Sequence, residues 1–166
     1  LKQGDLQGAL NAIAASSSSK RLTNLANMLA KNLGTTKISI VDNLGKKRSG
    51  IFDPQTNTIK LNKDTGLNTH TVLHELVHAV TSANLAKASH PTTKQLNTLF
   101  NNVKDSLSSA RGSKNLDEFV AEAMSNPEFQ AELASINVQG ETLPAWRKFQ
   151  NIIMNFIRGK LGLQTK

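Results

Sequence analysis

The spacing of apolar residues changes twice along the chain, and each change predicts a different kind of element. Up to Gly34 the apolar residues recur every three or four positions, which predicts two helices within residues 5–34. Asp5 is suited to cap the first helix, and Ser16–Ser19 separate it from the second. Gly34 is suited to end the second helix, because glycine adopts the left-handed conformation that closes many helices.

The period falls to two between residues 37 and 62, as expected of strands with one buried face. The alternation predicts three strands, at Lys37–Asp42, Ser49–Phe52 and Thr58–Asn62. Turn-forming residues fill the two links, and Asp53-Pro54-Gln55-Thr56-Asn57 is the second of them. The pattern predicts a small antiparallel sheet.

The helical period returns at Thr69 and continues almost to the end of the chain. Helices are expected at 69–84, 92–109, 115–125, 127–135 and 144–161. Pro127 and Pro144 mark the starts of the last two, because proline is favoured at the first helical position. The last helix carries an apolar stripe that we assign to the core: Trp146, Phe149, Ile153, Phe156 and Ile157. The sequence therefore predicts an α+β fold, mostly helical, with a small β-sheet before the helix at 69–84.

Length and composition narrow the class of protein. A chain of 166 residues suits a single domain, residues 1–166. It begins with Leu1 rather than methionine, so we expect it to be part of a larger protein. No signal-peptide pattern and no membrane-spanning apolar run is present, which favours a cytoplasmic or virion-associated location and no membrane partner. Because cysteine is absent, any metal must be held by histidine and carboxylate side chains.

The formal net charge of +8 raises the question of a nucleic-acid partner. The basic residues are scattered, and the tightest cluster, Lys46-Lys47-Arg48, follows Gly45 in an expected turn. A short basic cluster of this kind is usually a solvated surface. Nucleic-acid binding stays open, without a motif to support it.

The segment His74-Glu75-Leu76-Val77-His78 carries the clearest chemical signal. Residues four apart on a helix lie one turn apart on one face, so both imidazoles can reach one metal ion. Glu75 can then contact a metal-activated water and accept its proton. The competing interpretation is a chance match, but two histidines and a glutamate in an apolar helix are costly to bury without a purpose.

A catalytic zinc usually has three protein ligands, so a third must lie elsewhere. Ala83-Asn84-Leu85 stands where some zinc peptidases have a nearby third histidine. Glu118 and Glu122 share one face of the expected helix at 115–125, and on spacing alone either could bind the metal, with the other supporting a ligating histidine. The alternative is a solvated acidic helix edge. His70 and His90 are assigned to the rim of the helix and to a loop.

These two segments resemble a known family. HELVHAVT followed by EFVAEA is similar to gluzincin-type metallopeptidases, in particular the catalytic domain of anthrax toxin lethal factor. The order of the elements from about Gly4 to Leu163 also resembles metallopeptidase-like domains within large polyvalent proteins of phages and plasmids. The resemblance implies a zincin-like fold, a Zn²⁺ cofactor, and a peptide or protein substrate.

Carried over by position, the resemblance implies that His74, His78 and Glu118 bind zinc. Glu75 corresponds to the general base, and Glu122 to a glutamate that supports a ligating histidine. The resemblance also implies that an edge strand, here Thr58–Asn62, pairs with the extended substrate.

One position departs from the family pattern. The lethal-factor pattern places an oxyanion-stabilising tyrosine shortly before the third ligand, and this chain has no tyrosine. Arg111 lies near the corresponding place and could supply positive charge to the oxyanion. The sequence thus predicts a zinc metallopeptidase. The alternative is a zinc-stabilised binding module, weakly active or inactive, of a larger phage or mobile-element protein.

Overall fold

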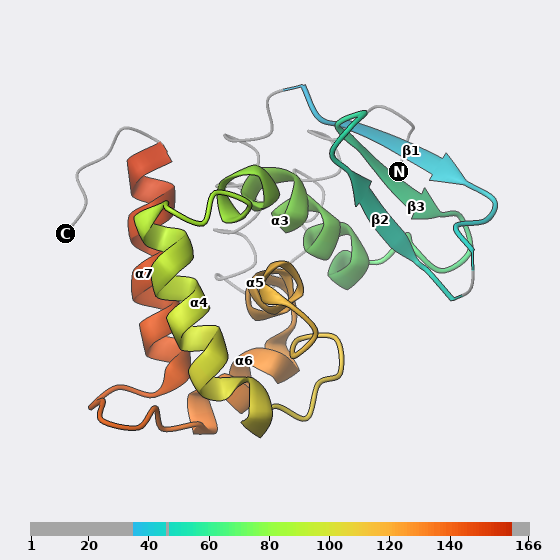
Figure 1. Cartoon of the computed structure of the whole chain (residues 1–166). Helices are drawn as coiled ribbons and strands as arrows, with labels where there is room; N and C mark the ends of the chain where they lie inside the picture. Colours follow the sequence, from blue (N-terminus) through green and yellow to red (C-terminus); the bar gives the residue numbers. More distant parts are fainter. Residues whose placement is uncertain (1–34, 46, 161–166) are drawn as a thin grey trace. The chain divides into compact units, whose positions relative to one another are not determined.

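The computed structural model describes residues 35–45 and 47–160, and it divides into two compact units after Ser82. We call the described part of the first the sheet unit and that of the second the helical unit. The elements, shown in Figure 1, are β1 Lys37–Val41, β2 Gly50–Asp53, β3 Thr58–Asn62, α3 Thr69–Leu85, α4 Pro91–Val103, the 3-10 helix η1 Lys104–Ser106, α5 Leu116–Ser125, α6 Pro127–Ser135 and α7 Ala145–Lys160. They confirm the α+β class. The helices expected within 5–34, and residue 161 at the end of the last helix, lie outside the described residues.

The three strands form a mixed sheet in the order β1-β3-β2. β3 runs antiparallel to β2 but parallel to β1, so the expectation of an antiparallel sheet was wrong for one of the two pairs. The link between β1 and β2 is too long for a tight two-residue hairpin. Strand β2 therefore does not pair with β1. The following strand, β3, lies between them and pairs with both.

This strand order also corrects the assignment of Thr58–Asn62 as the edge strand. That segment is β3, the central strand, and its backbone groups are taken by β1 on one side and β2 on the other. A central strand has no free side on which an extended peptide could pair. Among the described strands, the edges belong to β1 and β2.

One face of the sheet supplies apolar side chains to the core of the sheet unit. Ile38 pairs with Ile59, and both are buried together with Leu61. These residues alternate with partly exposed ones along β3, which confirms the period-two pattern.

The turn between β2 and β3 is held by its own side chains. The Asp53 carboxylate accepts a hydrogen bond from the Gln55 backbone at 3.0 Å, and a hydrogen bond with the Thr56 side chain holds the pKa of that carboxyl below its usual range. Asn57 adopts a left-handed backbone (φ 49°), which asparagine tolerates better than most residues. Its side chain bonds to Thr35 and Thr36, which precede β1. The predicted turn is confirmed.

Helix α3 begins after Asn68, whose side chain accepts a hydrogen bond from the Thr71 backbone at 2.9 Å. Asn68 therefore caps the helix. The middle of α3 is buried on nearly every side, including Leu73, Leu76 and Val77. A helix that is buried all round leaves its polar side chains little access to water.

The helical unit is organised around Phe119 of α5. Its ring lies 5.3 Å from that of Phe100 in α4, and 5.9 Å from those of Phe129 in α6 and Phe149 in α7, measured between centroids. Phe149, Ile153 and Phe156 are buried, which confirms the core assignment for these members of the α7 stripe. Rings at these separations and angles pack favourably beyond their buried area.

The predicted helix bounds hold for α6 and shift elsewhere. The helix expected at 92–109 ends at Val103 and passes through η1 into irregular chain, because Ser108 and Ser109 bond to side-chain and backbone groups instead of continuing the helix. Pro127 is the first residue of α6, as expected, whereas Pro144 lies just before α7. No helix among the described residues is long and apolar enough to cross a membrane.

The structure gives His90 a function at the start of α4. Its Nδ1 atom accepts a hydrogen bond from the Thr92 backbone at 3.2 Å, and its ring also contacts Phe156, with centroids 6.1 Å apart. We expect His90→Ala to lower the free energy of unfolding by about 1 kcal/mol, and His90→Asn to lower it less, because asparagine keeps the capping acceptor. Chemical denaturation of both variants measures this. Equal losses would assign the whole effect to ring packing.

Candidate metal centre

The two histidines and the glutamate of the HExxH segment lie in the buried part of α3. His74 is 1% exposed, Glu75 4% and His78 9%. Long ionisable side chains seldom reach such burial unless they are hydrogen-bonded, paired or bound to a metal. Burial also restricts each side chain to few conformations, so the donor atoms are held in place before any ligand arrives.

The two histidines point their Nε2 atoms at one another. These atoms lie 3.1 Å apart, and the ring centroids 4.8 Å apart. Two nitrogens bound to one tetrahedral zinc at about 2.0–2.1 Å lie about 3.3–3.4 Å apart. The pair is thus within a few tenths of an ångström of the separation that a shared ion requires. In the metal-free protein the same separation allows an N–H···N hydrogen bond between the rings.

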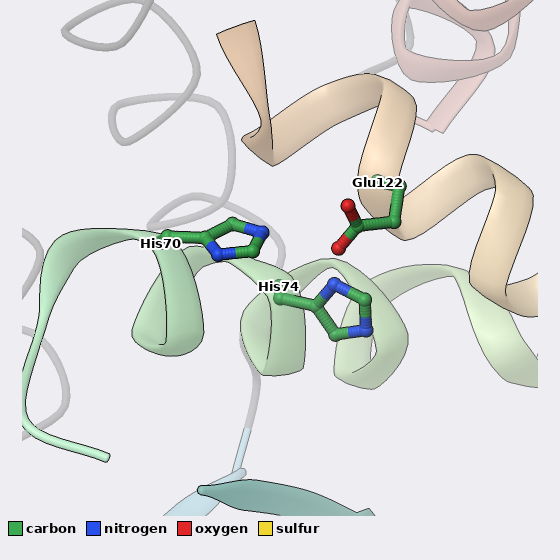
Figure 2. A group of neighbouring side chains, drawn as sticks. All are labelled: His70, His74 and Glu122. Atoms are coloured by element: carbon green, nitrogen blue, oxygen red, sulfur yellow. The ribbon is translucent and has the colours of Figure 1, made fainter. Parts of the chain in front are cut away.

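His70 extends the row of imidazoles by one turn. Its ring centroid lies 5.9 Å from that of His74, at 85°, and Figure 2 shows both side chains on α3. The sequence assigned His70 to the rim, and it is not among the buried residues. Three histidines at intervals of four residues therefore follow one face of the helix.

The helical unit carries two glutamates on α5. Asn115 caps this helix by accepting a hydrogen bond from the Glu118 backbone at 2.9 Å, which fixes the first turn. Glu118 is partly exposed, and Glu122, one turn later, is only 2% exposed. The interpretation of this pair as a solvated helix edge is therefore wrong for Glu122.

Asn126 holds the Glu122 carboxylate at the end of α5. Its amide donates to Glu122 Oε2 at 2.8 Å, while its Oδ1 atom accepts from the Glu128 and Phe129 backbone and caps α6. One asparagine thus links the conformation of Glu122 to the start of the next helix. This contact with Glu122 was not predicted from the sequence. The spacing of four between them was the available signal.

Arg111 lies beside Glu118 in the helical unit. Its Nε atom is 3.7 Å from Glu118 Oε2, and the arginine side chain is 50% exposed. The segment around it is anchored to α6, because Ser108 donates to Glu132, and a side chain at Gly112 would collide with the ring of Phe129. Positive charge is thus held next to one of the two acidic residues.

Two combinations of three histidine and glutamate side chains enter the proposal below as candidate metal ligands. The first is His74, His78 and Glu118, and the second is His70, His74 and Glu122 (Figure 2). Imidazole nitrogen and carboxylate oxygen are the ligands that zinc takes in cysteine-free sites, so the donor set fits zinc. In each combination the histidines belong to the sheet unit and the glutamate to the helical unit.

Comparison with known proteins adds no identification. No protein-family description, no curated protein and no solved structure matches this chain.

The contact between Asn126 and Glu122 leads to a stability prediction. We expect Asn126→Ser to keep a capping oxygen for α6 but to lose the hydrogen bond to Glu122. Asn126→Asp also keeps the cap, but it places a second carboxylate against Glu122. The aspartate variant should therefore lose more, about 1–3 kcal/mol of the free energy of unfolding at neutral pH.

Denaturant titration at pH 7 compares the two variants. If the aspartate variant is as stable as the wild type, the hydrogen bond at Glu122 contributes nothing.

Proposed function

We propose that this chain is a zinc-dependent peptidase of the zincin type, in which His74, His78 and Glu118 bind the metal. The observation that carries the proposal is the pair of buried imidazoles on α3, whose Nε2 atoms lie 3.1 Å apart. The buried glutamate between them in sequence completes the HExxH arrangement. Two histidines and one carboxylate leave a fourth position for water or substrate, which distinguishes a catalytic zinc from a structural one.

The chemistry of peptide hydrolysis divides among the residues of this chain. Zinc would supply the positive charge that acidifies a water molecule and polarises the scissile carbonyl. Glu75 accepts a proton from the attacking water and returns it to the leaving amine. Its burial favours this function, because a carboxylate shielded from bulk solvent keeps the proton within the site.

Two further residues support the reaction in this proposal. Glu122 accepts the ring N–H of a ligating histidine, which fixes the orientation of the ring and raises its basicity. Arg111 supplies positive charge to the tetrahedral oxyanion, in the absence of any tyrosine from the chain. The ion pair of Arg111 with Glu118 keeps the guanidinium next to the proposed third ligand.

Replacing the general base separates metal binding from catalysis. Glu75→Gln preserves the size of the side chain but cannot accept a proton, so we expect bound zinc to remain near one ion per chain. Cleavage should fall by about 10²–10⁴-fold, the usual contribution of a general base. Elemental analysis of the purified variant, together with cleavage of denatured casein and a peptide library, measures both. Undiminished cleavage by Glu75→Gln contradicts the proposed mechanism.

Replacing each acidic residue of α5 identifies the third ligand. We expect Glu118→Ala to lose zinc. Glu122→Ala should retain it with affinity reduced by about 10–100-fold, the typical effect of removing a residue that supports a ligand. Competition with a fluorescent zinc chelator gives both affinities.

His70→Ala and His78→Ala are the matched controls within α3, because each removes one histidine of a single group. Loss of zinc from His70→Ala and Glu122→Ala, with His78→Ala and Glu118→Ala unaffected, would assign the metal to the second group.

The second candidate function is a zinc-stabilised binding module without turnover. The observation in its favour is the absence of tyrosine from a chain that otherwise follows the lethal-factor pattern. The net charge of +8 adds an acidic partner, nucleic acid included, to the possible ligands. Stoichiometric zinc with no cleavage of any substrate tested, in wild type as in Glu75→Gln, selects this function over the peptidase.

A further inference from the structure

Strand β2 begins at a glycine that lies directly against the proposed general base. A methyl group added at Gly50 would meet Glu75 Cγ at 2.9 Å, Thr71 Cγ2 at 2.9 Å and Leu61 Cδ2 at 3.2 Å. The first two distances are shorter than carbon atoms adopt in packed interiors, since their optimal separation is about 3.5–4.0 Å. The Glu75 and Thr71 side chains can therefore lie this close to β2 only because residue 50 has no side chain.

The conformation of Gly50 gives no other reason for a glycine here. Its backbone is that of a β-strand, and it is not one of the two glycines, Gly45 and Gly140, that have positive φ among the described residues. Glycine in a strand is unfavourable by about 0.5–1 kcal/mol relative to alanine. Close approach of another group is the usual reason for a glycine inside a strand, and the groups that approach Gly50 come from α3 and β3.

We infer that Gly50 is a positioning residue, whose bare α-carbon sets the conformation of the Glu75 side chain. Of the three groups that would meet a methyl there, Leu61 is fully buried, and Thr71 is β-branched with a stiff side chain. Glu75 has the most rotatable bonds. A methyl at position 50 would therefore turn the Glu75 side chain away from β2, or push β2 away from α3.

The consequence for catalysis rests on the proposed function. A general base must lie within hydrogen-bonding distance of the water whose proton it takes, and a displacement of about 1 Å can cost about 10²-fold in rate. Zinc binding should not change, because the methyl meets neither His74 nor His78 among its nearest neighbours. Gly50 therefore acts on the reaction through Glu75 alone.

The first experiment tests the contact without any reaction. In the wild-type protein we expect a strong nuclear Overhauser effect between the Gly50 α-protons and the Glu75 γ-protons. In Gly50→Ala we expect the three-bond couplings of Glu75 to report a different rotamer. An absent Overhauser effect, or an unchanged rotamer in Gly50→Ala, overturns the inference whether or not the protein is a peptidase.

The second experiment tests the effect on catalysis in the zinc-loaded protein. We expect Gly50→Ala to keep its zinc and to change KM by less than threefold, while kcat falls by about 10- to 100-fold. Ile59→Val, in the fully buried core of the same sheet, is the control for general loss of stability. A kcat that falls in both variants in proportion to stability, or that stays unchanged in Gly50→Ala, overturns the inference.

Two further variants keep the outcomes distinct. Should Gly50→Ala fail to fold, the double variant Gly50→Ala/Thr71→Ala is used instead. It removes the Thr71 methyl that would collide with the new methyl at position 50, but it keeps that new methyl against Glu75. Stability should then recover while kcat stays low, and recovery of both overturns the inference. Glu75→Gln, assayed in parallel, reports on the proposed function itself, since its full activity would contradict the peptidase mechanism but leave the rotamer result standing.

Discussion

The proposed site depends on one physical constraint, the cost of burying ionisable side chains in α3. His74, Glu75 and His78 lie among leucines and valines that are themselves inaccessible to water. Removing such groups from water without partners costs several kcal/mol each, so a helix that carries three of them must give them a defined environment. The near contact of the two Nε2 atoms is part of that environment. A buried helix that served only as core would be more stable with apolar residues at these positions.

The sheet is small, and at Gly50 it directly approaches α3. Its buried face supplies Ile38, Ile59 and Leu61 to the core, and Gly50 brings the backbone of β2 against Glu75. Because β3 is central, its position is fixed by hydrogen bonds on both sides. Strand β2, which lies next to Glu75, is thereby held in register by β3, through pairs such as Gly50 with Leu61.

The helical unit holds its carboxylates by a different means. Phe119 anchors α5 among the aromatic rings of α4, α6 and α7, so the turn that bears Glu118 and Glu122 is fixed by apolar packing. Polar contacts then restrain each carboxylate separately. Arg111 lies beside Glu118, and Asn126 binds Glu122. Apolar packing thus sets the position of the helix, and hydrogen bonds and charge set the conformation of its acidic side chains.

The sequence by itself determined the type and order of the described elements and the placement of two histidines and a glutamate on α3. Local periodicity predicted β3 and α6 at their observed bounds, and spacing alone placed two histidines on one helical face, because both properties depend on residues only a few positions apart. Strand order depends on pairing between distant segments, so the parallel pairing of β1 with β3 was visible only in the tertiary structure. The burial of Glu122 and the approach of Gly50 to Glu75 were decided there too. In each case a residue's surroundings come from another element, and no local pattern specifies which one packs there.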